Sequence, residues 1–205
     1  MTKLLSTLSS IFLTGCTVFG IRTAEQPSYQ LLHSDSAFEI RQYPVLVVAE
    51  TTIAGDYQTG SREGFQRLAS YIFGNNRRQQ QITMTAPVVQ EPLTETLSMT
   101  APVIQQNSGG VWMMAFVLPK EITLANAPLP LDSEVVIKEL PAKKIAVSRY
   151  SGRLSAERIA EKSAALQKWL AEHDYKVIST ARSAAYDPPW TLPFLRRNEI
   201  HIDIE

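Results

Sequence analysis

Apolar residues recur at every second position in short stretches of the chain, which is the pattern of a half-buried β-strand. Residues 198–205 show it most clearly, because three isoleucines alternate there with charged or polar residues. The apolar face consists of Ile200, Ile202 and Ile204, and the polar face of Glu199, His201 and Asp203. Residues 111–118 form a further predicted strand. We expect the polar face of residues 198–205, with Glu199 and His201, to lie at the protein surface.

Two other segments carry apolar residues at helical spacing. The apolar residues of the first are Phe65, Leu68, Ala69, Ile72 and Phe73, and Gly74-Asn75 follows as a C-terminal stop. The second begins at Ser155, a good N-cap, and its apolar stripe consists of Ile159, Leu166, Trp169 and Leu170. Each segment is therefore predicted to be an amphipathic helix with one buried face.

These elements belong to a long-range duplication. A shift of 97 positions, which brings Pro44 onto Pro141, makes similar residues coincide along two strands and a glycine. The coinciding pairs are Ile40 with Ile137, Arg41 with Lys138, Val48-Ala49 with Ile145-Ala146, Gly55 with Gly152, Leu68 with Ala165 and Ile72 with Trp169. Beyond the helices a small insertion raises the offset to 101, so that Pro87 meets Pro188 and a further strand follows in each copy.

The repeating unit is strand–strand–helix–strand–strand, used twice. Each half has one apolar helix face, and joining the two sheets is the simplest way to bury both faces. We therefore predict an α+β fold, a distorted antiparallel β-barrel or curved sheet with two pseudo-symmetric halves and two helices packed outside. Residues 119–130, with prolines at Pro119, Pro128 and Pro130, are predicted to join the halves.

The phrase Met-Thr-Ala-Pro-Val occurs twice, at residues 84–88 and 99–103. Alternation would place Met84, Ala86 and Val88 on one face of a strand. A proline inside each copy indicates edge strands or bulges, because proline cannot donate a hydrogen bond to the ladder. We predict that the two copies are neighbouring strands of the first half and pack the barrel wall.

The first residues have the pattern of a bacterial lipoprotein signal. Lys3 precedes an apolar run at residues 4–13, which is too short for a membrane span of about 20 apolar residues. The run ends in Leu13-Thr14-Gly15-Cys16, which resembles a lipobox, and Cys16 is the only cysteine. We predict a signal peptide at 1–15, a lipidated tether at 16–30 and one domain at 31–205. The alternative is a cytosolic protein with an apolar start and a buried thiol.

A lipid on Cys16 would anchor the chain to a membrane of the cell envelope, on the periplasmic side. Thr17 follows the cysteine, which favours the outer membrane if the host is Gram-negative. The predicted partner is then the lipid bilayer, reached through the anchor.

Composition and motifs argue against two broad functions. The formal net charge is zero and the paired cations, such as Arg77-Arg78, form no basic stripe, so nucleic acid is not an expected partner. The chain contains no Gly-x-Ser-x-Gly motif, no Cys–His pair and no cluster of carboxylates. Asp187 and Glu199 are interpreted as a turn residue and a strand-surface residue. The chain is therefore predicted not to be an enzyme.

Several stretches together resemble the SOUL haem-binding protein family, in the family's order and from about residue 28 to the C-terminus. They are residues 38–44, Arg62-Glu63, both Met-Thr-Ala-Pro-Val segments, Phe116-Val117-Leu118-Pro119, Ala127-Pro128-Leu129-Pro130, Tyr150-Ser151-Gly152, Tyr186-Asp187-Pro188-Pro189 and Arg196-Arg197-Asn198-Glu199-Ile200. The resemblance implies a distorted β-barrel of two related halves with two helices. It also implies binding of haem and other tetrapyrroles, without catalysis.

The resemblance further implies a hydrophobic groove between the first helix and the loop before the last strand. The helix side comprises Arg62, Phe65 and Ala69, and the loop side comprises Tyr186, Trp190, Leu192, Phe194, Leu195, Arg196 and Arg197. Aromatic residues would form a flat slot, and arginines would meet the two propionates. Family members can carry Met at the positions of Phe65 and Ala69, so Ala69 removes bulk from the groove. The aromatic residues could instead seal the end of the barrel.

The sequence assigns no axial ligand to a haem iron. Of the three histidines, His33, His173 and His201, none has a partner at a spacing typical of metal sites. Met84 and Met99 could bind iron, but methionine on an apolar strand face usually packs in the core. The alternative function is a structural or interaction module that holds a peptide or lipid in the same groove.

Overall fold

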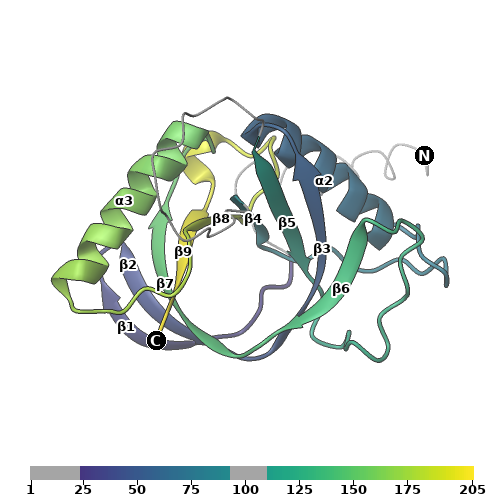
Figure 1. The fold of residues 1–205 in the computed structure, drawn as a ribbon, viewed down its shortest axis with the longest axis horizontal. Coiled ribbons are helices and arrows are strands. Elements are labelled where there is room, and N and C mark those ends of the chain that lie inside the picture. The colour runs from purple at the N-terminus through teal and green to yellow at the C-terminus, as the bar shows by residue number, and fades with distance from the viewer. Residues whose placement is uncertain (1–23, 93–109) are drawn as a thin grey trace, which may run out of the picture.

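The computed structural model describes residues 24–92 and 110–205. Nine strands form one sheet in which all neighbours are antiparallel, in the order β1-β2-β7-β9-β8-β4-β5-β3-β6 (Figure 1). The strands are β1 (Gln30–Asp35), β2 (Phe38–Tyr43), β3 (Leu46–Ala54), β4 (Val88–Pro92), β5 (Val111–Val117), β6 (Val135–Leu140), β7 (Lys143–Tyr150), β8 (Arg182–Ala185) and β9 (Asn198–Ile204). The sheet curls but does not close, so the predicted barrel is an open half-barrel with β1 and β6 at its edges.

The strand order is symmetric about the pair β4–β8. On one side lie β5, β3 and β6, and on the other lie their counterparts β9, β7 and β2. The first strand of each half is exchanged, because β2 pairs with β7 of the second half and β6 pairs with β3 of the first. This arrangement confirms the predicted pseudo-symmetric strand–strand–helix–strand–strand halves.

The predicted offset of 97 positions holds for the first two strands of each half. The bounds of β2 and β6 differ by this offset at both ends, and Val48 of β3 corresponds to Ile145 of β7. The predicted match of Pro87 with Pro188 is wrong, because Pro87 precedes β4 whereas Pro188 follows β8. The connections between each helix and its next strand differ in length. A match between two single prolines therefore does not give the correct alignment of β4 with β8.

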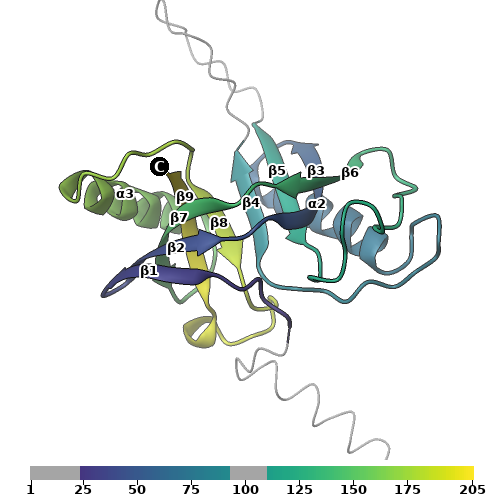
Figure 2. The same cartoon turned by 90° about the horizontal axis from the view of Figure 1, so that it is seen from below.

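Two helices cover the outer face of the curled sheet, on opposite flanks (Figures 1 and 2). α2 (Tyr57–Ile72) packs Leu68 and Ile72 against β3 and β5, and α3 (Ala156–Glu172) packs Leu166 and Leu170 against β7 and β9. Asp56 and Ser155 cap the N-termini by accepting bonds from backbone N–H groups. Both predicted helices are therefore confirmed. The first predicted stripe is buried at Leu68, Ala69 and Ile72, whereas Phe65 is exposed.

The end of α2 shows why the helix stops where the sequence indicated. Phe73 is the C-cap and is exposed, so it does not belong to the buried stripe. Gly74 follows with a φ of +113°, a left-handed backbone conformation that favours glycine.

Strand β1 and the residues before it were not predicted as parts of the sheet. β1 pairs with β2 and contains His33, and every residue of β1 is exposed. Further upstream, the backbone N–H of Ala86 donates to the carbonyl of Glu25 (2.9 Å). The chain is thus in contact with the sheet from its first described residues onward.

The first Met-Thr-Ala-Pro-Val copy is not a strand over its whole length. β4 begins only at Val88, after the cis bond between Ala86 and Pro87. Met84 and Val88 pack against the core under α2, whereas Ala86 packs in a different cluster with Tyr186. The predicted common face of Met84, Ala86 and Val88 is therefore wrong, because Pro87 cannot join a ladder. The second copy lies outside the described residues, as does Cys16 with the whole predicted signal segment.

Among the described residues, no helix is long and apolar enough to cross a membrane.

Candidate functional site

The polar face of β9 lies in the interior of the protein. Glu199 is 0% exposed, and His201 and Asp203 are also buried. The expectation that Glu199 and His201 lie at the surface is therefore wrong. Every residue of β9 is buried, so both faces of this strand are covered. Its isoleucines pack with residues of α3, and its polar residues lie on the inner face of the curled sheet.

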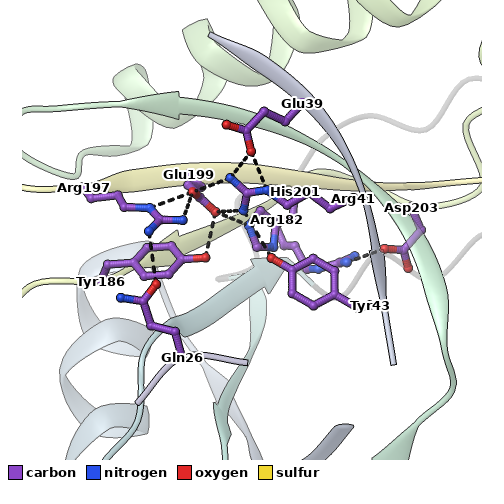
Figure 3. A network of polar contacts seen from close by, with 10 residues as sticks. All are labelled: Gln26, Glu39, Arg41, Tyr43, Arg182, Tyr186, Arg197, Glu199, His201 and Asp203. Atoms are coloured by element: carbon purple, nitrogen blue, oxygen red, sulfur yellow. Dashed lines mark hydrogen bonds and ion pairs between the residues drawn. The ribbon is translucent and has the colours of Figure 1, made fainter. Parts of the chain in front are cut away.

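Four side chains donate hydrogen bonds to the buried carboxylate of Glu199 (Figure 3). Arg41 binds both oxygens, at 2.9 Å (Oε2) and 3.0 Å (Oε1), and Nε of Arg197 lies 2.8 Å from Oε1. The hydroxyl of Tyr186 (2.7 Å) and Nε2 of His201 (2.8 Å) both reach Oε2. Because each oxygen of this carboxylate is held by charged or polar donors, burial of the ion is compensated.

These contacts determine the protonation states of the network. Burial alone would raise the pKa of Glu199, but the hydrogen bonds from His201 and Arg41 and the charge of Arg41 outweigh it and hold this pKa well below its usual range. Burial lowers the pKa of His201 despite the nearby carboxylate, so we assign a neutral ring that donates its Nε2–H to Glu199. Burial also opposes the charge of Arg41, yet Glu199 raises the pKa of Arg41 above its usual value.

A second buried acid, Asp203, lies two residues further along β9. It accepts bonds from Arg182 and from Nζ of Lys143 (2.6 Å). Burial would raise the pKa of Asp203, and these two cations lower it below its ordinary value. The polar face of β9 is thus neutralised along its length by arginine and lysine from β2, β7 and β8 and by Arg197.

The loop between β8 and β9, residues 186–197, is tied to this network at both ends. Arg197 donates its backbone N–H to Asp187 Oδ2 (2.6 Å), and its guanidinium lies 4.0 Å from the ring centroid of Tyr186. Tyr186 in turn donates its backbone N–H to the carbonyl of Arg197 (3.2 Å). The hydroxyl of Tyr186 and the guanidinium of Arg197 both bind Glu199. The buried carboxylate therefore fixes where the loop leaves and re-enters the sheet.

The interior of the loop is also ordered by hydrogen bonds. Nε of Arg196 donates to the carbonyl of Thr191 (2.7 Å), and its Nη2 donates to the carbonyl of Pro189. Gly152 donates its N–H to Pro193 (2.9 Å), at the start of a short 3₁₀ helix, η1 (Pro193–Leu195). This loop is pre-organised rather than loose.

The ordered loop presents large aromatic surfaces to solvent. Trp190 is 62% exposed and Phe194 is 70% exposed, while Leu192 is half-buried. Phe194 borders an open cavity of about 510 Å³ beside the loop, together with Arg149, Arg196 and Arg197. Loops that a scaffold holds in place while exposing apolar side chains are common binding sites.

Arg149 of β7 is a candidate that sequence reasoning missed. It lies directly before the Tyr150-Ser151-Gly152 motif and borders the same cavity as Phe194. Its neighbour Tyr150 also borders the cavity, and the buried hydroxyl of Tyr150 makes no hydrogen bond to any described residue.

The helix-side residues lie on α2, which packs on β3 and β5 of the first half. Arg62 is exposed, Phe65 makes an edge-to-face contact with Phe116 (5.4 Å between ring centroids), and Ala69 is buried. The loop follows β8 of the second half, and β4 lies between β8 and β5 in the sheet. The structure thus places the two predicted sides on different halves. Arg62, Phe65 and Ala69 are not among the described residues that border the 510 Å³ cavity.

The three histidines lie away from this cavity. His33 and His173 both stack on Trp169, with centroid distances of 6.0 Å and 4.5 Å, and His201 is inside the network on β9. Within residues 24–92 and 110–205, no group of three or more His, Cys, Asp or Glu residues is arranged to hold a metal ion.

The family model and the similar sequences both point to heme-binding proteins. The family model described as SOUL heme-binding protein matches residues 24–203. Heme-binding protein 2 of Homo sapiens is 30% identical over 169 residues, which cover 80% of this chain and 76% of that protein. Heme-binding protein 1 of Xenopus laevis is 24% identical over 165 residues, covering 80% and 82%.

Solved structures share the fold at low sequence identity. The C-terminal domain of EcmrR has a TM-score of 0.59 and 14% identity, covering 86% of this chain and 98% of that domain. An uncharacterized conserved protein from Listeria innocua also has a TM-score of 0.59, with 10% identity, covering 82% and 92%. The family match, which spans nearly all described residues, gives the assignment: this chain belongs to the SOUL heme-binding protein family.

Proposed function

We propose that this chain binds haem or a related tetrapyrrole at the loop between β8 and β9, as a binding protein and not as an enzyme. The observation that carries the proposal is an ordered loop that exposes Trp190 and Phe194, together with an open cavity that is bordered by Phe194 and three arginines. The names of its relatives in the family support the same ligand class.

The residues at this cavity fit the chemistry of a tetrapyrrole. Such a ligand has flat apolar faces, which exposed aromatic rings can cover, and carboxylates, which arginine binds well. Phe194, Trp190 and Leu192 would contact the faces. Arg149 would meet a carboxylate directly, since Arg197 is already engaged by Glu199. Arg196 also borders the cavity and would contribute its charge while it donates to the carbonyls of Thr191 and Pro189.

A bound haem would supply the iron, while the residues of this chain hold the ring and the carboxylates. No histidine borders the cavity among the described residues. We therefore expect protoporphyrin IX, which lacks iron, to bind with an affinity within about tenfold of that of hemin.

Two of the predicted residues would act indirectly. Tyr186 and Arg197 have their polar groups in the buried network, so they would position the loop. On the helix side, exposed Arg62 and partly exposed Phe65 remain proposed contacts for a ligand edge that reaches α2. Ala69 is buried, and its small side chain would set how closely that edge can approach the helix.

The test is a titration of the whole purified chain with hemin, followed by the Soret absorbance. Phe194→Ala with Trp190→Ala should weaken binding at least tenfold. The control is Phe73→Ala, which removes a similarly exposed ring at the end of α2 and should leave binding unchanged. Arg149→Glu should weaken binding, unlike Arg77→Glu at a distant exposed site, and Arg62→Glu tests the helix side.

Unsaturable hemin binding that is insensitive to these loop variants would overturn the proposal. If, in that case, the chain captured a peptide or lipid from membranes in a way that required the loop aromatics, the interaction module would be the better function. Turnover of a porphyrin or ester that is lost on substitution of Asp187 would instead indicate an enzyme.

We also propose that Cys16 is lipidated and anchors the chain at the cell envelope on its periplasmic side. The support is the apolar run followed by Leu13-Thr14-Gly15-Cys16. In a Gram-negative host, the chain should fractionate with outer membranes, and Cys16→Ala should release it or leave its signal uncleaved. Equal recovery of both forms in the soluble fraction would contradict the anchor.

A further inference from the structure

A second cavity, of about 160 Å³, lies on the inner face of the curled sheet. Its apolar wall comes mainly from the first half, with Val48 on β3 and Ala115 and Val117 on β5. It shares no bordering residue with the cavity beside the β8–β9 loop. A cavity of this size with an apolar wall can hold a ligand body about as large as benzene, which occupies a cavity of ~150 Å³ in another protein.

The charged groups around this cavity are paired, with one exception. Lys138 and Glu50 form an ion pair, with Nζ of Lys138 2.6 Å from Glu50 Oε2. Asp203 is held by Lys143 and Arg182, as described above. His201 donates to Glu199.

The exception is Glu91 on β4. Its neighbour Gln90 accepts a hydrogen bond from Ser61 on α2, so alternation turns Glu91 to the inner face, where it borders the cavity. The carboxyl of Glu91 makes no hydrogen bond or ion pair with any described residue. Burial raises the pKa of Glu91, although Arg182 and Lys143 act in the opposite direction, while Asp203 and Glu50 add to the rise.

We propose that this inner cavity binds a small organic cation, a protonated amine on an apolar body, with its ammonium group at Glu91. The apolar body would lie against Val48, Ala115 and Val117. The ammonium would pair the one carboxylate around the cavity that lacks a partner, which completes the charge pairing of the wall. This site is independent of the proposed tetrapyrrole site.

The test uses benzylammonium as the probe and benzoate as a matched anion, with binding to the whole chain measured by calorimetry at pH 7. Benzylammonium should bind at least tenfold more tightly than benzoate. Glu91→Gln should reduce benzylammonium affinity at least tenfold, whereas Glu139→Gln, at an exposed position on β6, should not change it. Ala115→Leu should block binding by filling the cavity.

The pH dependence has a defined sign. A carboxyl with a raised pKa becomes ionised only as pH rises, so benzylammonium affinity should increase with pH through that transition and should lose this dependence in Glu91→Gln. Thermal unfolding of each variant shows that it is folded. Equal affinity for the anion and the cation, or unchanged affinity in folded Glu91→Gln or Ala115→Leu, would overturn the proposal.

Discussion

The two halves share a fold but differ on the inner face of the sheet. Val48 pairs with Val117 in the first half, and its counterpart Ile145 pairs with Asp203 in the second. By the same register, Ala115 corresponds to His201 and Met113 to Glu199. The first half therefore supplies the apolar wall of the inner cavity, and the second half carries a buried charged network. Part of that network, Arg182, His201 and Asp203, also borders the cavity.

The helix-facing sides of the same strands do not differ in this way. Met114 and Phe116 pack under α2 in the first half, and their counterparts Ile200 and Ile202 pack under α3 in the second. Burial of an apolar helix face requires an apolar partner, so this layer is constrained in both halves. No helix covers the inner face, so its residues can differ between the halves. They line a cavity in the first half, and they anchor the β8–β9 loop in the second.

The largest expected effect comes from removing the centre of the charged network. Glu199→Ala removes the carboxylate that Arg41 and Arg197 share, which leaves the buried Arg41 with the carboxylate of Glu39 alone. It should lower the free energy of unfolding by about 3–5 kcal/mol. Its counterpart Met113→Ala, at a half-buried position, should cost at most about 2 kcal/mol. Urea denaturation at pH 7 measures both, and equal losses would break the comparison.

The helix-facing layers should respond alike. Leu68 on α2 and Leu166 on α3 are both fully buried. Leu68→Ala and Leu166→Ala should each lower the free energy of unfolding by about 2–5 kcal/mol, through lost burial and the cavity left behind. If one substitution were nearly neutral, the two cores would not be equivalent.

Acid should destabilise the second half through its carboxylates. The pKa of Asp203 and that of Glu199 are below their ordinary values in the folded chain. Their contribution is thus present above the unfolded-state pKa values of about 4 and is lost as pH falls through the folded values. Asp203→Asn should reduce this loss, because it removes one of the two carboxylates. Unfolding measured between pH 7 and pH 3 checks the slope, and an unchanged profile would contradict it.

The smallest effect is expected at the helix caps. Asp56→Ala and Ser155→Ala each remove a side chain that accepts from a backbone N–H at an equivalent helix start. Each should cost about 1 kcal/mol. Thermal unfolding of the two variants tests whether the halves are matched at this level, and a difference above about 1 kcal/mol would argue against it.

Local patterns in the sequence were sufficient for both helices and for the duplication, although not for β1 or for the start of β4. Helical spacing with Ser155 and Gly74 located both helices, and the offset from Pro44 to Pro141 located the first two strands of each half. These features depend on neighbouring residues and on the need to bury apolar faces, which a sequence records directly. The register after the helices did not follow, because it depends on connections of unequal length.

The tertiary structure alone decided the environment of the polar residues. Alternation showed that Glu199, His201 and Asp203 share a face of β9, but it could not show whether that face meets water. Only the curl of the sheet and the exchange of β2 into the second half bring Arg41 onto Glu199. For the same reason, only the folded structure shows that Arg149 borders the same cavity as Phe194. The sequence by itself thus determined which residues lie side by side along an element, and the packing of distant strands determined which of them are buried, paired or exposed.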